Sequence, residues 1–362
     1  MEEDYQVTTD KQGLLKVGAV GFVFIGLCII FITCLETCNG WGKQVDMNSL
    51  SKLWTFRANI GSYIGGVVGS LFTLSGFFLL YLTLQKQKEA FLKERFENKF
   101  FELLKLHREN VNEFEIRNGV KGRKCFIVML NEFHYIYKLT QIGAAIESKT
   151  DKHYLFEDDA FKDEKVVDLA FKIFFFGVGY NSEKQLQHFV SANEFKFYKE
   201  FIKENLKNIQ DGYLKFKKEN NGEYYEVNAP IDGEGDELTF ETICYPFDGH
   251  SIRLGHYYRL LFQCVKFVDR QIILSDDEKK FFINTLRAQL SNQEQLLLYY
   301  DSLSEFGRVW HKKGYFKKYF FLRNIPLALV RVKPHPHEKI GVLNEEGKVY
   351  FEWDKDRIQN KN

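Results

Sequence analysis

The sequence predicts a mainly α-helical membrane protein. It would have a two-helix transmembrane hairpin in residues 1–84 and a multi-helix cytoplasmic domain in residues 85–330. Two long uncharged apolar stretches precede a region with repeated helical patterning, and Phe is common at 36 residues while Pro is rare at 5. Large apolar side chains with few helix breakers favour packed helices. A small β-prone insertion is expected at about 211–249, and residues 331–362 form a C-terminal tail.

The two apolar stretches have the length of membrane spans. No charged residue occurs between Val17 and Leu35 or between Ile60 and Leu84. About 20 helical residues cross a hydrocarbon core of roughly 30 Å, so spans are expected at about 14–35 and 60–84. A cleaved signal peptide is the alternative for the first span. The acidic residues before it and the sequence Glu36-Thr37-Cys38-Asn39 after it argue for a retained anchor.

Basic residues beside the spans predict their orientation. The loop between the spans contains Lys43, Lys52 and Arg57, with Trp41 and Trp54 as interfacial anchors. The tail before the first span and the flank after the second contain more basic residues: Lys11, Lys16, Lys86, Lys88, Lys93, Arg95 and Lys99. Because basic residues stay inside, both termini are expected in the cytoplasm.

The second span contains a row of small residues at helical spacing. Gly61, Gly65 and Gly69 recur every four residues, and Thr73 continues the row. Small residues on one helix face let another backbone approach closely within lipid. Two interpretations remain open. The row packs the two spans of one chain together, or it joins several chains into a homo-oligomer that could form a pore.

The region after the spans predicts a series of helices. Ser275 and Ser291 each precede a glutamate by three residues, which is the capping-box pattern of a helix start. The first of these helices should end near residue 290. A β-hairpin is expected in the insertion, and another in residues 341–353. The other expected helices cover residues 85–117, 123–146, 158–176, 183–190, 193–209, 254–270 and 312–323.

The sequence contains no motif of a known catalytic or cofactor site. It has no phosphate-binding loop, dinucleotide fingerprint, nucleophile elbow or zinc-protease motif, so no catalytic residue, cofactor or metal site is predicted. His335 and His337 lack further ligands at zinc spacing, which favours a flexible tail. Cys125, Cys244 and Cys264 show no paired spacing and are expected as reduced, buried thiols. A net charge of +1 argues against a general nucleic-acid binder.

One predicted helix carries a basic face. His256, Arg259, Lys266 and Arg270 fall at helical spacing opposite an apolar face. They form either a solvated surface or a stripe that binds an acidic segment, a nucleic acid or a neighbouring subunit.

A further arginine, Arg287, shares a face with Ile283 and Leu290 and should point inward. A buried arginine requires a carboxylate or several carbonyls, and Glu294 is the local carboxylate for a structural ion pair.

Two groups of residues carry a resemblance to a known family, the AbiC-like phage abortive infection proteins. The N-terminal group is Phe100–His107 and Gly122–Phe126, which contains Arg123. The C-terminal group is Gly255–Phe262, Val268–Asp269, Leu286–Ser291, Glu294, Leu296–Tyr300, Leu303–Ser304 and Gly307. The resemblance covers roughly residues 90–325, and within it His107, Arg123, Arg287 and Glu294 stand out as structural or functional residues.

The resemblance implies antiphage defence in the bacterial inner membrane, in which an infected cell stops growing or dies. Together with the paired spans, it leads to the hypothesis of an effector that perturbs the membrane. By analogy of architecture, a separate sensor protein or a ribonucleoprotein such as a retron complex could act beside it. One alternative is a membrane-tethered RNase, for which Arg331 and His337 have suitable spacing but Pro334 and Pro336 break the required helix. Another is a non-catalytic scaffold or sensor.

Overall fold

The computed structural model describes residues 2–39, 55, 58–59, 61–117, 119–149, 162–220, 224–230 and 237–353. These residues form two compact units, Met1–Glu97 and Asn98–Asn362. Helices dominate both units, and the strands make two small two-stranded sheets. The predicted fold class, mainly helical with a small β element, is confirmed. The predicted interfacial residues Trp41 and Trp54 lie outside the described residues.

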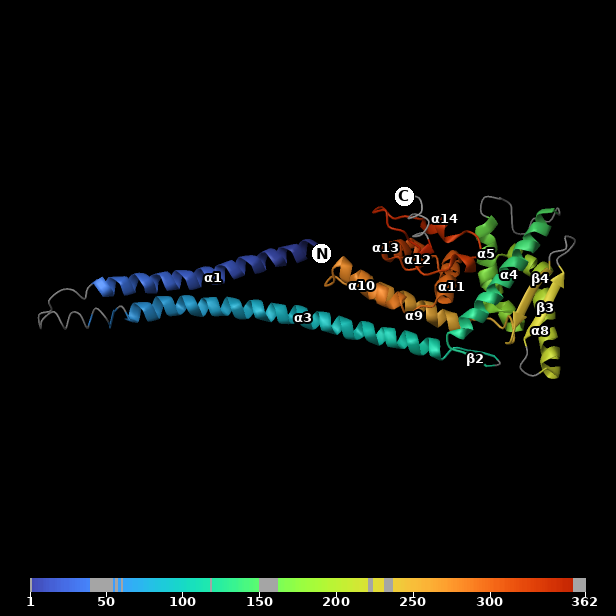
Figure 1. Cartoon of the computed structure of the whole chain (residues 1–362), viewed down its shortest axis with the longest axis horizontal. Helices are drawn as coiled ribbons and strands as arrows, with labels where there is room; N and C mark the ends of the chain where they lie inside the picture. Colours follow the sequence, from blue (N-terminus) through green and yellow to red (C-terminus); the bar gives the residue numbers. More distant parts are fainter. Residues whose placement is uncertain are drawn as a thin grey trace, which may run out of the picture. The chain divides into compact units, whose positions relative to one another are not determined.

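The first unit contains a pair of long helices. Helix α1 covers Glu2–Asn39, and a π-helical turn η2 over Ile64–Val68 leads into α3, Gly69–Asn112. The Ser75 hydroxyl donates to the Ala19 carbonyl at 2.9 Å, and the rings of Phe22 and Phe78 stack with centroids 6.1 Å apart. The two helices therefore lie side by side (Figure 1).

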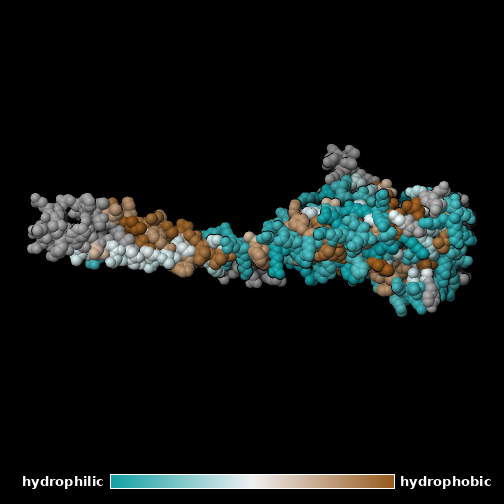
Figure 2. Space-filling view, turned by 90° about the horizontal axis from the view of Figure 1, so that it is seen from below, coloured by the Kyte–Doolittle hydropathy of each residue, from teal (hydrophilic) through white to brown (hydrophobic). Residues whose placement is uncertain are grey.

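These helices have the length and composition to cross a membrane. The apolar segments are Gly13–Ile32 and the helical residues from Gly61 onward, and only 11% and 17% of their most apolar windows is buried. A core helix of a soluble protein would be mostly buried, whereas a span exposes its apolar side chains to lipid. Figure 2 shows hydrophobic side chains gathered on the surface of this hairpin.

The second helix continues further than expected. Helix α3 runs without interruption to Asn112, so residues 61–112 do not divide into a span and a separate helix. After it, the chain makes a small antiparallel hairpin of β1, Glu115–Ile116, and β2, Val120–Lys121. The predicted helix over residues 85–117 was therefore wrong at its C-terminal end. The hairpin buries Ile116, which explains why the chain leaves the helix there.

The second unit is a helical bundle that also contains a longer β-hairpin. Strand β3, Tyr225–Pro230, pairs antiparallel with β4, Glu237–Thr242, as the sequence predicted for the insertion. The longer helices are α4 (Lys124–Lys149), α5 (Lys162–Phe176), α6 (Tyr180–Phe189), α8 (Lys203–Glu219), α9 (Ser251–Asp269), α10 (Asp276–Arg287) and α11 (Asn292–Leu303). The shorter ones are α7 (Ala192–Phe197), the π-helical η4 (Tyr198–Ile202), α12 (Val309–Lys312), α13 (Tyr315–Tyr319), the 3₁₀ turn η5 (Leu327–Leu329) and α14 (Pro336–Ile340).

Helix α11 lies at the centre of this unit. Every residue from Glu294 to Leu303 is buried, as expected for a helix that neighbours cover on all sides. Phe133 of α4 contacts Tyr300 of α11 and the rings of Phe171 and Phe174 on α5. Both predicted capping boxes are present, at Ser275 before α10 and Ser291 before α11.

A close backbone contact fixes the start of α9 against the end of α5. Gly177 and Gly249 have φ values of 79° and 84°, and a Cβ on Gly177 would lie 2.4 Å from the Gly249 nitrogen. Only glycine fits at such a contact. The His250 amide then donates to the Phe175 carbonyl at 2.8 Å, which holds α9 at this point.

Three local predictions were wrong. Helix α8 extends to Glu219, so the β-prone segment begins later than residue 211. The helix expected at 312–323 is two short helices, because the chain turns at Gly314 with a φ of 66°. The described part of the tail is packed rather than flexible, with Val332 and Phe351 fully buried. The hairpin expected in residues 341–353 is present in minimal form, as an antiparallel bridge between Leu343 and Val349.

Candidate functional site

The glycine row of the hairpin borders open space in the part of the chain that the structure describes. A Cβ added at Gly61, Gly65 or Gly69 would meet no atom of the described residues within 4 Å. By contrast, a Cβ on Gly26 of α1 would lie 3.2 Å from the Phe72 ring. The described contacts between the two helices are made by the face with Phe72 and its neighbours, and the interpretation that the row packs the two spans of one chain together stays a prediction.

The row instead lines an open groove of about 580 Å³ on the hairpin. The Thr73 hydroxyl donates to the Gly69 carbonyl at 2.8 Å, so this polar group is satisfied within its own helix. The groove thus offers an apolar, close-approach surface to another helix. The groove residues are Gly65, Gly66, Gly69, Ser70, Thr73, Leu74 and Phe77.

A buried polar cluster in the second unit centres on Glu294. The Ser291 amide donates to Glu294 Oε2 at 2.6 Å, and the Tyr257 hydroxyl donates to Oε1 at 3.1 Å. Arg123 Nε lies 3.7 Å from Oε2, and its guanidinium also donates to the Gln289 carbonyl. Burial, and next the Glu294 charge, raise the pKa of Tyr257 well above its usual value. The cluster therefore joins the start of α11, α9 and the segment before α4.

His107 of α3 lies beside this cluster without a hydrogen bond. It is 1% exposed, its ring centroid lies 5.0 Å from that of Tyr257, and neither ring nitrogen has a partner among the described residues. Burial, and to a lesser extent the Arg123 charge, lower the pKa of His107 to about 4. The imidazole is consequently neutral at physiological pH.

Arg287 does not pair with Glu294. Its Nη1 donates to the Phe320 carbonyl at 2.7 Å, while Arg123 provides the cation near Glu294. Phe320 adopts a left-handed φ of 52°, the C-cap of α13. Burial, and next the charge of Arg323, lower the pKa of Arg287. The local spacing of Arg287 and Glu294 was misleading, because α10 ends at Arg287 and the partner comes from far along the chain.

The basic face of α9 is on the surface. His256, Arg259 and Arg270 are exposed and Lys266 is half-buried. The opposite face is buried, with Tyr257 among its fully buried residues. No side-chain hydrogen bond or ion pair of these four residues is present in the part of the chain that the structure describes. The stripe could bind an acidic group, and its geometry is equally that of a solvated surface.

A second buried polar pair was not found from the sequence. His250 Nε2 lies 2.9 Å from Glu132 Oε2, and the two side chains are 2% and 1% exposed. The residues are 118 positions apart, so no local spacing could indicate the pair. Over the described residues, no group of three or more His, Cys, Asp and Glu side chains could hold a metal ion.

The residues considered for RNase chemistry do not form a site. His337 lies in α14, and its Nε2 accepts a hydrogen bond from the Trp353 indole at 2.8 Å. Arg331 lines a pocket with His134 instead. The structure thus places the two residues in different environments.

Comparisons with known proteins identify one segment of the chain. No curated protein and no solved structure matches it. A family model described as "Putative phage abortive infection protein" matches residues 249–329, which begin just before α9 and include the basic stripe, Arg287 and Glu294. This segment is therefore similar to the phage abortive infection proteins.

Proposed function

We propose that the protein is an antiphage effector of the bacterial inner membrane that causes abortive infection by perturbing the bilayer. The two helices of the hairpin would cross the membrane with both termini in the cytoplasm. Copies of the chain would associate through the glycine row after infection. The similarity of residues 249–329 to phage abortive infection proteins supports the biological setting.

One observation carries the mechanism: the groove of the glycine row is open although the hairpin is already packed. Within one chain, α1 and α3 meet through Ser75, Phe78 and Phe72, on a different face. Lipid provides no hydrophobic drive for helix association, so close van der Waals contact along a small-residue surface is the main source of binding energy. A groove of this kind on a packed hairpin favours a second hairpin as its occupant.

The second unit would control this association. Its described residues provide a packed helical core and an exposed basic stripe, without a metal cluster. A signal that reaches the stripe or another surface of this unit could release the hairpins for assembly. The geometry of the described residues does not favour the tethered RNase, because Arg331 and His337 contact different groups.

Substitution of Gly65 by leucine tests the proposal. A leucine side chain in the groove would block a neighbouring backbone, while the helix itself should persist because leucine is the better helix former. The matched control is Gly21→Leu on α1, where an added Cβ likewise meets no atom of the described residues within 4 Å. Chemical cross-linking in membranes should detect oligomers of the wild type and of Gly21→Leu after infection, and far fewer of Gly65→Leu. Equal oligomer formation by all three proteins would contradict the proposal.

A further inference from the structure

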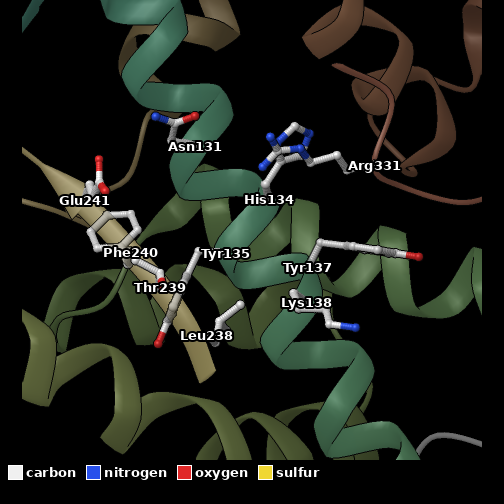
Figure 3. Close-up of a pocket in the computed structure, with 10 residues that line it drawn as sticks. All are labelled: Asn131, His134, Tyr135, Tyr137, Lys138, Leu238, Thr239, Phe240, Glu241 and Arg331. Atoms are coloured by element: carbon white, nitrogen blue, oxygen red, sulfur yellow. The ribbon is translucent and has the colours of Figure 1, made fainter. Parts of the chain in front are cut away.

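A pocket in the second unit lies between α4 and the free edge of β4. It has a volume of about 510 Å³, within the range of ligand-binding pockets. Four consecutive residues of β4, Leu238 to Glu241, form one wall, and residues of α4 form the other (Figure 3). The residues on α4 are Asn131, His134, Tyr135, Tyr137 and Lys138, and Arg331 completes the lining.

The strand edge at this pocket is unpaired. Over the described residues, β4 pairs with β3 alone in a two-stranded sheet. Among the described residues, no backbone hydrogen bond outside that sheet involves Leu238–Glu241. A strand with free amide and carbonyl groups is a template for another extended chain, and a helix beside it provides side-chain contacts. Four strand residues at about 3.3 Å each give an edge of roughly 13 Å.

The charges at the pocket favour an acidic ligand. Lys138 and Arg331 are both exposed cations, whereas Glu241 is the single acidic residue in the lining. In Figure 3 Glu241 and Asn131 lie toward one end of the pocket, and Leu238 and Lys138 toward the other. The side chain of His134 adds no charge at neutral pH, because burial lowers its pKa to about 4.

A nucleotide fits this lining less well. Binding of a base relies on an aromatic face on which it can stack. Tyr135, Tyr137 and Phe240 are only 3%, 4% and 3% exposed, and the Tyr135 hydroxyl donates to Asn205. Their faces are thus covered by the protein itself. The exposed groups of the pocket are polar side chains and a strand edge, which suit a peptide.

We propose that this pocket binds an extended segment of a partner protein that adds to β4 as a third strand and pairs an acidic side chain with Lys138 or Arg331. The inference is independent of the membrane mechanism, because it concerns only contacts within the second unit. A protein that fails to assemble through its glycine row would still bind the peptide.

The test is a selection from a random octapeptide library on the full-length protein in detergent, followed by anisotropy measurements on the enriched peptides. These peptides should contain Asp or Glu, and Arg331→Glu should weaken their binding about tenfold or more. Lys215→Glu is the control, an exposed lysine on α8 outside the pocket. The proposal would be refuted if the selection yielded no peptide that is enriched on the wild-type protein relative to the Arg331→Glu protein.

Backbone methylation provides a second, variant-free measurement. In an added strand, alternate amides point to β4 and the others to solvent. N-methylation of one alternating set of peptide amides should therefore abolish binding, and methylation of the other set should have little effect. An equal effect of both sets, or no effect of either, would exclude strand addition.

Discussion

Replacing His107 by phenylalanine tests how a buried imidazole without a hydrogen-bond partner affects the stability of the second unit. The imidazole is 1% exposed and has no hydrogen-bond partner among the described residues, so it loses its water contacts on folding without compensation. Phenylalanine keeps an aromatic ring beside Tyr257 and removes both nitrogens. Unsatisfied buried polar groups cost about 1–3 kcal/mol. The free energy of unfolding of the variant at neutral pH should therefore equal or exceed that of the wild type.

The pH dependence of this difference can be derived from the pKa of His107. The folded protein holds that pKa at about 4, against the ordinary histidine value of 6.5. As the pH falls from about 7.5 to about 5, the unfolded state takes up a proton that the folded state does not. With about 1.4 kcal/mol per pKa unit, the wild type should lose roughly 2 kcal/mol of stability from this group. His107→Phe lacks this loss, so its advantage over the wild type should grow by that amount.

Urea unfolding of the full-length protein in detergent, followed by tryptophan fluorescence, measures this difference at both pH values. All other titrating groups are shared by the two proteins and cancel in the comparison. The same exchange at His188, whose side chain is exposed, provides the control. A stability difference between wild type and His107→Phe that is the same at both pH values would refute the assignment of a buried, neutral imidazole.

Three other substitutions have defined outcomes. Arg287→Ala removes the charged donor to the Phe320 carbonyl and should cost about 1.5–3 kcal/mol in unfolding experiments; normal stability with lost defence would indicate a binding function instead. Glu294→Ala removes the acceptor of the buried Tyr257 hydroxyl and the carboxylate near Arg123, and should cost about 1–3 kcal/mol, more than the equivalent change in the solvent-accessible capping box of α10. Reversing the charge of Arg259 should change stability by less than about 0.5 kcal/mol and reduce protection against phage; full protection would favour a merely solvated stripe.

Much of the fold follows from local patterns in the sequence. The apolar spans, the capping boxes at Ser275 and Ser291 and the buried face of α9 depend on residues within one or two turns of each other. Such short-range signals act in the same way in most contexts. They could not reveal that α3 continues to Asn112. An amphipathic segment that follows a span has the same sequence pattern whether or not the helix is interrupted between them.

The candidate sites depend on long-range contacts and were predicted less well. Glu294 was predicted as the partner of Arg287, whereas Arg123 provides the nearby cation from a different part of the chain. The pocket beside β4 brings together residues near 134, 240 and 331, and no spacing in the sequence connects them. The direction of the glycine row was also undetermined, because the sequence shows that Gly65 and Gly69 share a face and does not show what that face meets.

The most direct test of the central claim is membrane integrity in infected cells. Cells with wild-type protein should admit a membrane-impermeant dye early in infection, before their RNA is degraded. Cells with Gly65→Leu at equal abundance should exclude the dye and lose protection, whereas Gly21→Leu should behave as the wild type. If Gly65→Leu cells still survive as a culture, or if protection occurs in cells that exclude the dye, the hairpin is a tether and the account of a membrane-perturbing effector is wrong.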